Sequence, residues 1–259
     1  MKQLRKLLET IDPIELFSQA WNDWLRSLAS ISAITLTLYL PYGYLSFFTP
    51  HTESDIPYSK IITMISTVVG LVIFVLLNGA VARSVNQTIR NQRETWYKTL
   101  LTTIRHLPAL ILPIIIPASI FIIPIVFFTE AEQINAFFEL ISLLSILLLL
   151  PFIFYSLLAS FYIFSIVIMR HQVPIAVRLT FEIARHKPIA TAIYAVLIYF
   201  LYIFSYTIFI LIPLSLPNTA FFSSLANSLI FILSSYFIVV QLALFHRLVK
   251  IREDEIKKT

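Results

Sequence analysis

Pro174-Ile-Ala-Val-Arg-Leu-Thr-Phe-Glu-Ile-Ala-Arg-His-Lys187 is a polar, basic stretch that leads directly into a long apolar run over residues 188–216. The stretch predicts an amphipathic helix lying in the membrane interface. The run that follows is long enough to cross a bilayer, which takes about 20 apolar residues. Shorter versions of the same arrangement occur twice earlier in the chain, so this pairing of segments is the pattern from which we predict the fold.

An arginine marks the junction in all three places. Arg185-His-Lys-Pro188 aligns with Arg105-His-Leu-Pro108 and with Arg26-Ser-Leu-Ala29, and the aligned arginines are 79 and 80 residues apart. After two apolar runs, a second basic residue closes each unit: Arg83, Arg170 and Arg247. We interpret the pattern as three repeated units, each an interfacial amphipathic helix plus a transmembrane hairpin. The alternative is that the basic loops of any six-span protein are spaced this evenly without internal repetition.

Composition places the chain among integral membrane proteins. Of its 259 residues, 58% are hydrophobic and 13% are charged, and the mean hydropathy is +0.86. A soluble domain has about one-quarter charged residues. With 3 Gly and no Cys, the chain offers no Gly-rich phosphate loop, disulfide or thiolate metal site. The net charge of +5 is dispersed among the membrane ends, so it does not indicate a nucleic-acid partner.

The predicted fold is all-α: a polytopic membrane protein of six transmembrane helices forming a single domain over residues 1–259. The six apolar runs cover residues 28–48, 61–81, 107–128, 136–169, 188–216 and 220–245. Residues 51–60 and 86–94 are expected to form polar connections. The charged tail from residue 247 is expected to be a helix end fraying into water.

The first interfacial helix is predicted to begin at Asp12, with Asp12 as N-cap and Pro13 in the first turn. Its apolar face would contain Ile14, Phe17, Trp21, Trp24, Leu25 and Leu28. The second interfacial helix would cover residues 96–107, with an apolar face of Trp96, Leu100, Leu101, Ile104 and Leu107. Both helices are expected to lie flat against the membrane before the chain enters it.

Basic residues set the predicted orientation. Cytoplasmic loops of membrane proteins carry an excess of Lys and Arg. On the six-span arrangement, 18 of the 19 Lys and Arg residues fall on one side of the membrane, and Lys60 alone falls on the other. Both termini are therefore predicted to be cytoplasmic.

Residues that could carry chemistry are scarce. Ionisable side chains within the spans are the usual functional sites of a polytopic protein, and here Glu139, near the start of the fourth run, is the main example. It is interpreted as snorkelling to the headgroups, with proton coupling as the alternative. Four histidines adjoin an arginine at separate helix ends and are expected to be solvated: His106, His171, His186 and His246. We predict no catalytic, metal or cofactor-binding residue, and no enzymatic activity.

The three aligned arginines are the candidate site. Arg26, Arg105 and Arg185 would stand at one depth on the cytoplasmic side, and guanidinium groups pair bidentately with phosphate. Membrane lipids, with anionic ones as candidates, are therefore the expected partners. The alternative is that these arginines only set topology.

Neutral polar residues occur within the runs and are expected to pack helices together. They are Tyr199, Tyr202 and Tyr206 in the fifth run, Ser156 and Ser160 in the fourth, Asn78 in the second, and Asn227 and Gln241 in the sixth. A polar crevice for an amphiphile is the alternative.

The chain resembles the YciC-like inner-membrane proteins of Gram-negative bacteria, and it is similar to the membrane domain of some glycerophosphodiester phosphodiesterases. The resemblance is carried by Phe17-Ser-Gln-Ala-Trp-Asn-Asp-Trp24, Val177-Arg-Leu-Thr-Phe-Glu-Ile-Ala-Arg185, Leu225-Ala-Asn-Ser-Leu-Ile230 and Phe245-His-Arg-Leu-Val-Lys250. It implies a six-span protein of the bacterial inner (plasma) membrane and carries over no catalytic residue.

The leading functional hypothesis is a multi-pass protein without catalytic activity that interacts with lipids or organises envelope components. The alternative is a permease or channel-like carrier for an amphiphilic or neutral solute. Polar residues of several spans that converge on one cavity would favour the carrier.

Overall fold

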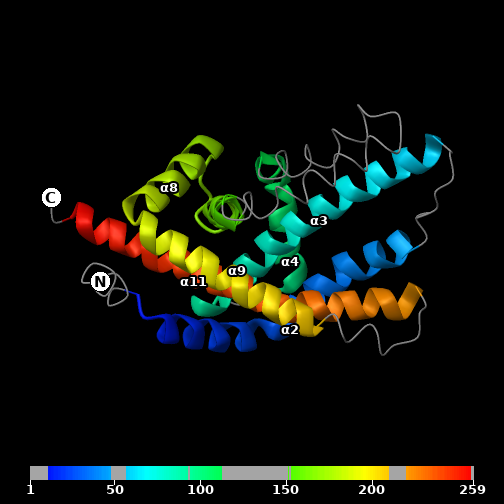
Figure 1. Ribbon diagram of the computed structural model, residues 1–259, viewed down its shortest axis with the longest axis horizontal. Coiled ribbons are helices and arrows are strands. Elements are labelled where there is room, and N and C mark those ends of the chain that lie inside the picture. Colours follow the sequence, from blue (N-terminus) through cyan, green and yellow to red (C-terminus); the bar gives the residue numbers. More distant parts are fainter. Residues whose placement is uncertain are drawn as a thin grey trace.

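The computed structural model describes residues 11–47, 57–92, 94–112, 151, 153–209 and 220–257, and every regular element in these ranges is a helix (Figure 1). The labelled helices are α2 (Pro13–Phe47), α3 (Pro57–Ile89), α4 (Trp96–Arg105), α5 (Leu107–Leu110), α8 (Val173–His186), α9 (Pro188–Phe209) and α11 (Ala220–Ile256). The all-α prediction is confirmed for this part of the chain.

Four described segments are long and apolar enough to cross a membrane: Pro13–Leu45, Ile65–Ile89, Pro188–Ser205 and Phe221–Asp254. They contain or overlap the predicted runs at residues 28–48, 61–81, 188–216 and 220–245. The described end of the fourth run forms the helix Ile153–Val167. Residues 113–150, which include Glu139, most of the third run and the first part of the fourth, lie outside the described residues. The count of six spans therefore stays a prediction.

Helix α2 begins where the sequence predicts. The backbone N–H of Ile14 donates to Oδ1 of Asp12 at 2.9 Å, and Pro13 opens the helix. An aspartate N-cap followed by proline satisfies one backbone donor that the first turn leaves free and removes another. The beginning of α2 is therefore decided by two neighbouring residues, as the sequence predicts.

The predicted division of α2 into an interfacial helix and a separate span is wrong. The helix runs without a break through Arg26 and Leu28 and ends at Phe47. Ala29 stands where the other two junctions have a proline, and alanine has the highest helix propensity of any residue. Nothing at this junction interrupts the backbone hydrogen bonds, so a single helix contains both the predicted interfacial segment and the predicted span.

The other two junctions do interrupt the helix. α8 ends at His186 and α9 begins at Pro188, with Lys187 between them at φ −131° and ψ 63°. A residue that precedes proline is sterically pushed out of the α conformation. At the earlier junction α4 ends at Arg105, His106 forms a turn, and α5 follows with Pro108 in its first turn. Proline thus separates the amphipathic helix from the apolar one in both places.

Helix α3 is longer than predicted at both ends. It begins at Pro57, inside the expected loop, because proline suits the first helical position. It continues to Ile89, through the first residues of the expected polar connection. Asn91, two residues beyond the helix end, has a φ of 53°, and the N–H groups of Gln92 and Asn91 donate to the carbonyls of Gln87 and Thr88. This is a Schellman ending, in which asparagine tolerates the left-handed conformation.

Helix α11 packs along α2 over much of its length, and the beginning of α2 and the end of α11 lie at the same end of the structure (Figure 1). The expected fraying tail is instead helical to Ile256. The Trp24 indole N–H donates to Oγ of Ser235 at 2.9 Å, and the Tyr236 hydroxyl donates to the carbonyl of Phe17 at 3.1 Å. Two amphipathic side chains therefore fasten α2 to α11.

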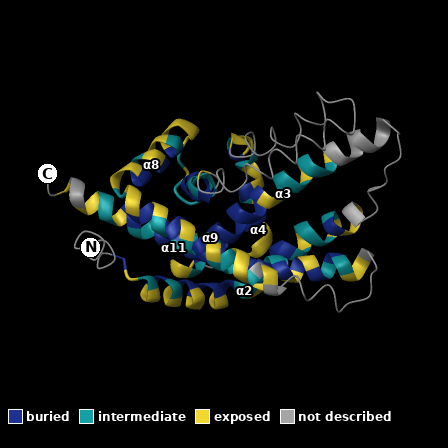
Figure 2. Cartoon of the chain, viewed as in Figure 1, coloured by how far each residue is buried: buried dark blue, intermediate teal, exposed yellow. Residues whose placement is uncertain are grey.

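Large apolar side chains lie on the outside of the bundle. Phe200 and Phe204 on α9 and Phe181 on α8 are all about 60% exposed. Small hydroxyl side chains such as Ser228 and Thr191 are fully buried between the helices. Figure 2 shows the exposed residues along the outer faces of α2, α8 and α9. Lipid-facing helices have this distribution, because lipid tails solvate apolar residues and small residues permit close helix packing.

Candidate functional site

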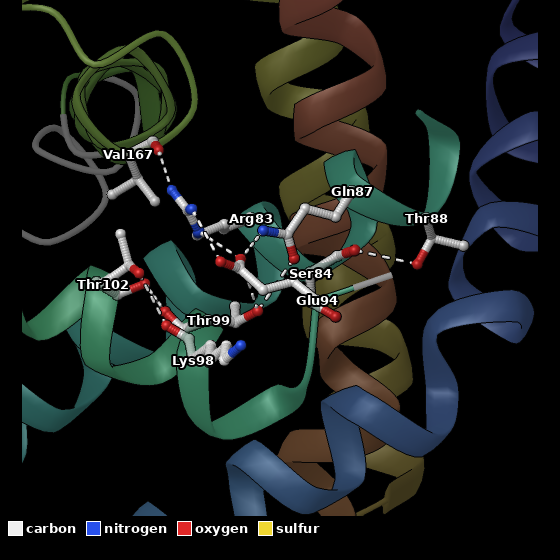
Figure 3. Close-up of polar contacts among 10 residues, drawn as sticks. Arg83, Ser84, Gln87, Thr88, Glu94, Lys98, Thr99, Thr102 and Val167 are labelled. Carbon is white, nitrogen blue, oxygen red and sulfur yellow. Dashed lines mark hydrogen bonds and ion pairs between the residues drawn. The ribbon is translucent and has the colours of Figure 1, made fainter. Parts of the chain in front are cut away.

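A buried arginine is the centre of the first polar constellation. Arg83, near the end of α3, is 7% exposed. Its Nε donates to Glu94 at 3.2 Å, and its guanidinium also donates to the carbonyl of Val167 at 3.3 Å. Figure 3 shows the guanidinium between these two partners. The charge of Arg83 is thus paired both with a carboxylate and with the end of the helix Ile153–Val167.

The remaining oxygens of this constellation are also engaged. The Gln87 amide donates to the Glu94 carboxylate, and the Thr99 hydroxyl donates to the Gln87 side-chain oxygen at 3.0 Å (Figure 3). Gln87 is 8% exposed and Thr99 is fully buried. We call these residues (Arg83, Gln87, Glu94 and Thr99) the Arg83 network. It ties α3, α4 and the helix Ile153–Val167 together with every charge paired, which is how buried ionic groups are retained.

The Arg83 network explains how α4 is seated. Its buried residues are Thr99, Leu100 and Thr103, whereas Leu101 is 54% exposed. The apolar face that the sequence predicts therefore points mostly outward. A Cβ on Gly79 of α3 would lie 3.0 Å from Cγ2 of Thr103, so glycine permits this close approach of α4 to α3. Exposed apolar residues and a buried polar face suit a helix in contact with lipid.

A small crevice between α2, α3 and α11 is the second polar constellation. Its volume is about 140 Å³. The apolar wall consists of Val85, Ile89, Val239, Leu242 and Ala243, and the polar wall consists of Gln19, Asp23, His246, Arg247 and Lys250. We call it the α2–α11 crevice. Its polar residues come from the first third of α2 and the last third of α11, so it opens at one end of the bundle.

Asp23 is the unusual member of the α2–α11 crevice. It is 9% exposed, and among the described residues no hydrogen bond reaches its carboxylate. The Arg26 guanidinium, one turn along α2, lies within electrostatic range of it. A carboxylate is an acceptor only, so a ligand in the crevice could supply the donor that the described residues do not.

Cations surround the mouth of the crevice. Arg247 is held by α2, because its guanidinium donates to Gln19 at 3.2 Å and lies 3.2 Å from the Glu15 carboxylate. Lys250, one turn further along α11, is exposed, and within the described ranges it pairs with no carboxylate. Arg90 lies within electrostatic range of His246. The crevice therefore combines one buried acceptor with a basic rim.

The three predicted arginines lie on three different helices and are all exposed. Arg105 is the last residue of α4, and Arg185 lies in the last turn of α8. Arg26 lies inside continuous α2. Arg26 alone is placed near one of the two constellations, through Asp23. The ring that the three would form stays a prediction.

Three of the four histidines are less solvated than predicted, whereas His186 is exposed as expected. His246 lines the crevice, and the Ser165 hydroxyl lies 2.9 Å from Nδ1 of His171. Burial lowers the pKa of the His106 imidazole, and the neighbouring Arg83 and Arg170 guanidinium groups lower it further. His106 is therefore neutral at pH 7.

Neutral polar residues within the helices mostly bond to their own backbone. The Asn78 amide donates to the carbonyl of Phe74 at 2.8 Å, and the Ser160 hydroxyl donates to that of Ser156 at 3.1 Å. The Tyr199 and Tyr202 rings lie 6.3 Å apart. Of the described members of this set, none lines the α2–α11 crevice, which agrees with a packing role.

Sequence reasoning missed both constellations. From the sequence, Arg83 is predicted to close a repeated unit, and Asp23 is not among the candidate site residues. A usable signal existed for the crevice. Gln19 and Asp23 are four residues apart on α2, and Arg247 and Lys250 are three apart on α11, so each pair shares a helix face. The pairing of the two faces required the tertiary structure.

The fold and these constellations define the class: an all-helical, membrane-embedded protein with four described membrane-length helices. Comparison with protein-family models, with curated proteins and with solved structures finds no match. The function of the chain is therefore inferred from its own geometry.

Proposed function

We propose that the chain is a multi-pass protein of the bacterial inner membrane, without catalytic activity, that binds phospholipid from the cytoplasmic leaflet. The α2–α11 crevice is the observation that carries this proposal. An apolar wall beside a basic rim matches a phospholipid headgroup, because the wall suits methylene groups linked to the phosphate and the rim suits the phosphate itself.

The location of the crevice supports binding at the leaflet surface. Its polar residues lie near the beginning of α2 and the end of α11, and both ends are cytoplasmic on the basic-residue argument. We further propose six spans in three units, of which the first has fused its interfacial helix to its span. An organising role for envelope components is compatible with lipid binding at this surface.

A carrier for an amphiphilic solute is the second candidate. Asp23 favours it, because a buried acceptor that faces a cavity between membrane-length helices is typical of substrate sites. Against it, the polar residues of the crevice gather at one end of the bundle instead of along the spans. Solute uptake into proteoliposomes would decide for the carrier.

Lipid retention tests the proposed function. The protein would be extracted into native nanodiscs, and the lipid that survives transfer to detergent would be identified by mass spectrometry. Ala243→Trp places an indole in the crevice and should reduce the retained phospholipid about tenfold. Ala192→Trp, at an exposed position on α9, is the matched control and should retain wild-type levels. Equal retention by all three proteins would overturn the proposal.

A further inference from the structure

We propose that the α2–α11 crevice selects a phospholipid whose headgroup carries a primary ammonium, with that ammonium on the Asp23 carboxylate and the phosphate at Lys250. The inference rests on the proposed function and names the class of lipid.

The Asp23 carboxylate sets the first requirement. It is less than a tenth exposed, lines the crevice, and accepts no hydrogen bond from any described residue. Arg26 lies within electrostatic range of this carboxylate, but no hydrogen bond joins them. A largely buried carboxylate without a donor is destabilising, and a ligand that supplies both a hydrogen bond and an opposite charge offsets that cost. A primary ammonium supplies three N–H donors and one positive charge.

The rim of the crevice sets the second requirement. Glu15 and Gln19 already hold Arg247, whereas Lys250 lines the same crevice and pairs with no carboxylate within the described ranges. An ammonium side chain binds phosphate as a point charge. A buried anion beside a free cation therefore matches a zwitterion with its ammonium inward and its phosphate at the mouth.

Size and charge separate the competing headgroups. A volume of about 140 Å³ admits a headgroup and no acyl chain. A choline headgroup is bulkier and has no N–H donor. A glycerol headgroup has hydroxyl donors but brings no positive charge to the carboxylate, and a serine headgroup adds a second carboxylate next to Asp23. The ethanolamine type of headgroup supplies an ammonium for Asp23 and a phosphate for Lys250 and adds no second carboxylate.

A methylation series of lipids is the test that needs no variant. The protein in detergent would be equilibrated with equimolar phosphatidylethanolamine and its mono-, di- and trimethylated forms, and bound lipid would be measured by native mass spectrometry. Retention should fall as N–H donors are replaced. The trimethylated lipid should be retained roughly tenfold less, as expected for loss of a charge-assisted hydrogen bond.

Asp23→Asn tests the residue. The variant lacks the negative charge that strengthens the hydrogen bonds from the ammonium, so it should lose most of its preference among the four lipids. Asp254→Asn makes the same change at an exposed position of α11 and should keep the wild-type preference. Lys250→Gln should weaken all four equally. Phospholipid binding without preference, or a preference that survives Asp23→Asn, would overturn the ammonium assignment and leave the proposed function standing. Retention of no phospholipid would overturn both.

Discussion

Arg83 and Asp23 are both charged, both on membrane-length helices, and nearly equally buried, at 7% and 9% exposed. Arg83 is paired with Glu94 and with the carbonyl of Val167. Asp23 accepts no hydrogen bond from the described residues. Burial therefore does not distinguish a structural charge from a functional one, whereas the state of its hydrogen bonds does.

The difference arises from the elements that face the two residues. After α3 ends, the chain turns at Asn91 and returns as α4, so Glu94 and Thr99 are delivered to Arg83 by a short local connection. Asp23 faces α11, which is more than 200 residues away in sequence and presents His246 and Arg247 at the edge of a cavity. In the Arg83 network every charge is paired within the protein, whereas the crevice at Asp23 leaves space for a ligand.

The largest expected effect on stability comes from removing the carboxylate of the Arg83 network. Glu94→Ala leaves the Arg83 charge buried without a carboxylate, which costs about 3–5 kcal/mol of unfolding free energy. The measurement is helix loss by circular dichroism in an SDS titration from mild detergent.

Arg83→Met combined with Glu94→Ala removes both charges and should recover much of that loss. Glu253→Ala, at an exposed position near the end of α11, is the control and should change little. A cost below about 1 kcal/mol for Glu94→Ala would mean that the Arg83 network does not stabilise the fold. Arg83 could then not be contrasted with Asp23 as a structural charge.

Ser235→Ala comes next in size and tests the hydrogen bond that fastens α2 to α11. The substitution removes the acceptor of the buried Trp24 indole N–H, and leaving that donor unsatisfied costs about 1–3 kcal/mol. The same SDS titration measures it. Trp24→Phe with Ser235→Ala removes both partners and should cost less than the two single changes added together; strict additivity would show that the hydrogen bond contributes nothing.

Glu182 provides a smaller, pH-dependent effect. The hydrogen bond from Arg178 lowers the pKa of the Glu182 carboxyl, and Arg252 of α11 lowers it further. A lowered folded-state pKa gives stability that is present at neutral pH and is lost as pH falls through that pKa. Amide exchange in α8 should therefore rise on acidification below the usual range of a glutamate. In Glu182→Gln that dependence should disappear, and its persistence would assign it to another group.

The smallest expected effect on stability is that of Asp23→Asn. Because the carboxylate has no hydrogen bond to lose, the unfolding free energy should stay within about 0.5 kcal/mol of wild type or rise. A loss comparable to that of Glu94→Ala would show that Asp23 is a structural charge. The contrast between Arg83 and Asp23 would then be wrong, and Asp23 would no longer support a bound ammonium headgroup.

Local sequence predicted the elements well wherever a single residue decides the backbone. Asp12 and Pro13 start α2, and Pro188 starts α9. The repeat alignment failed at Ala29, because alanine cannot interrupt a helix as Pro108 and Pro188 do. The polar connection after α3 was misjudged for the opposite reason: Gln87 is polar but helix-compatible, and its amide is satisfied within the Arg83 network.

Hydropathy and helix breakers act over a few neighbouring residues, so the sequence alone predicts a helical membrane protein and four of its membrane-length helices. Which polar groups meet depends on the tertiary structure. Arg83 pairs with Glu94 because α4 packs against α3, and Asp23 lines a cavity because α11, far away in the chain, packs against α2. Periodicity tells which side of a helix is polar. The partner of that side depends on where another helix packs, which is a property of the whole bundle.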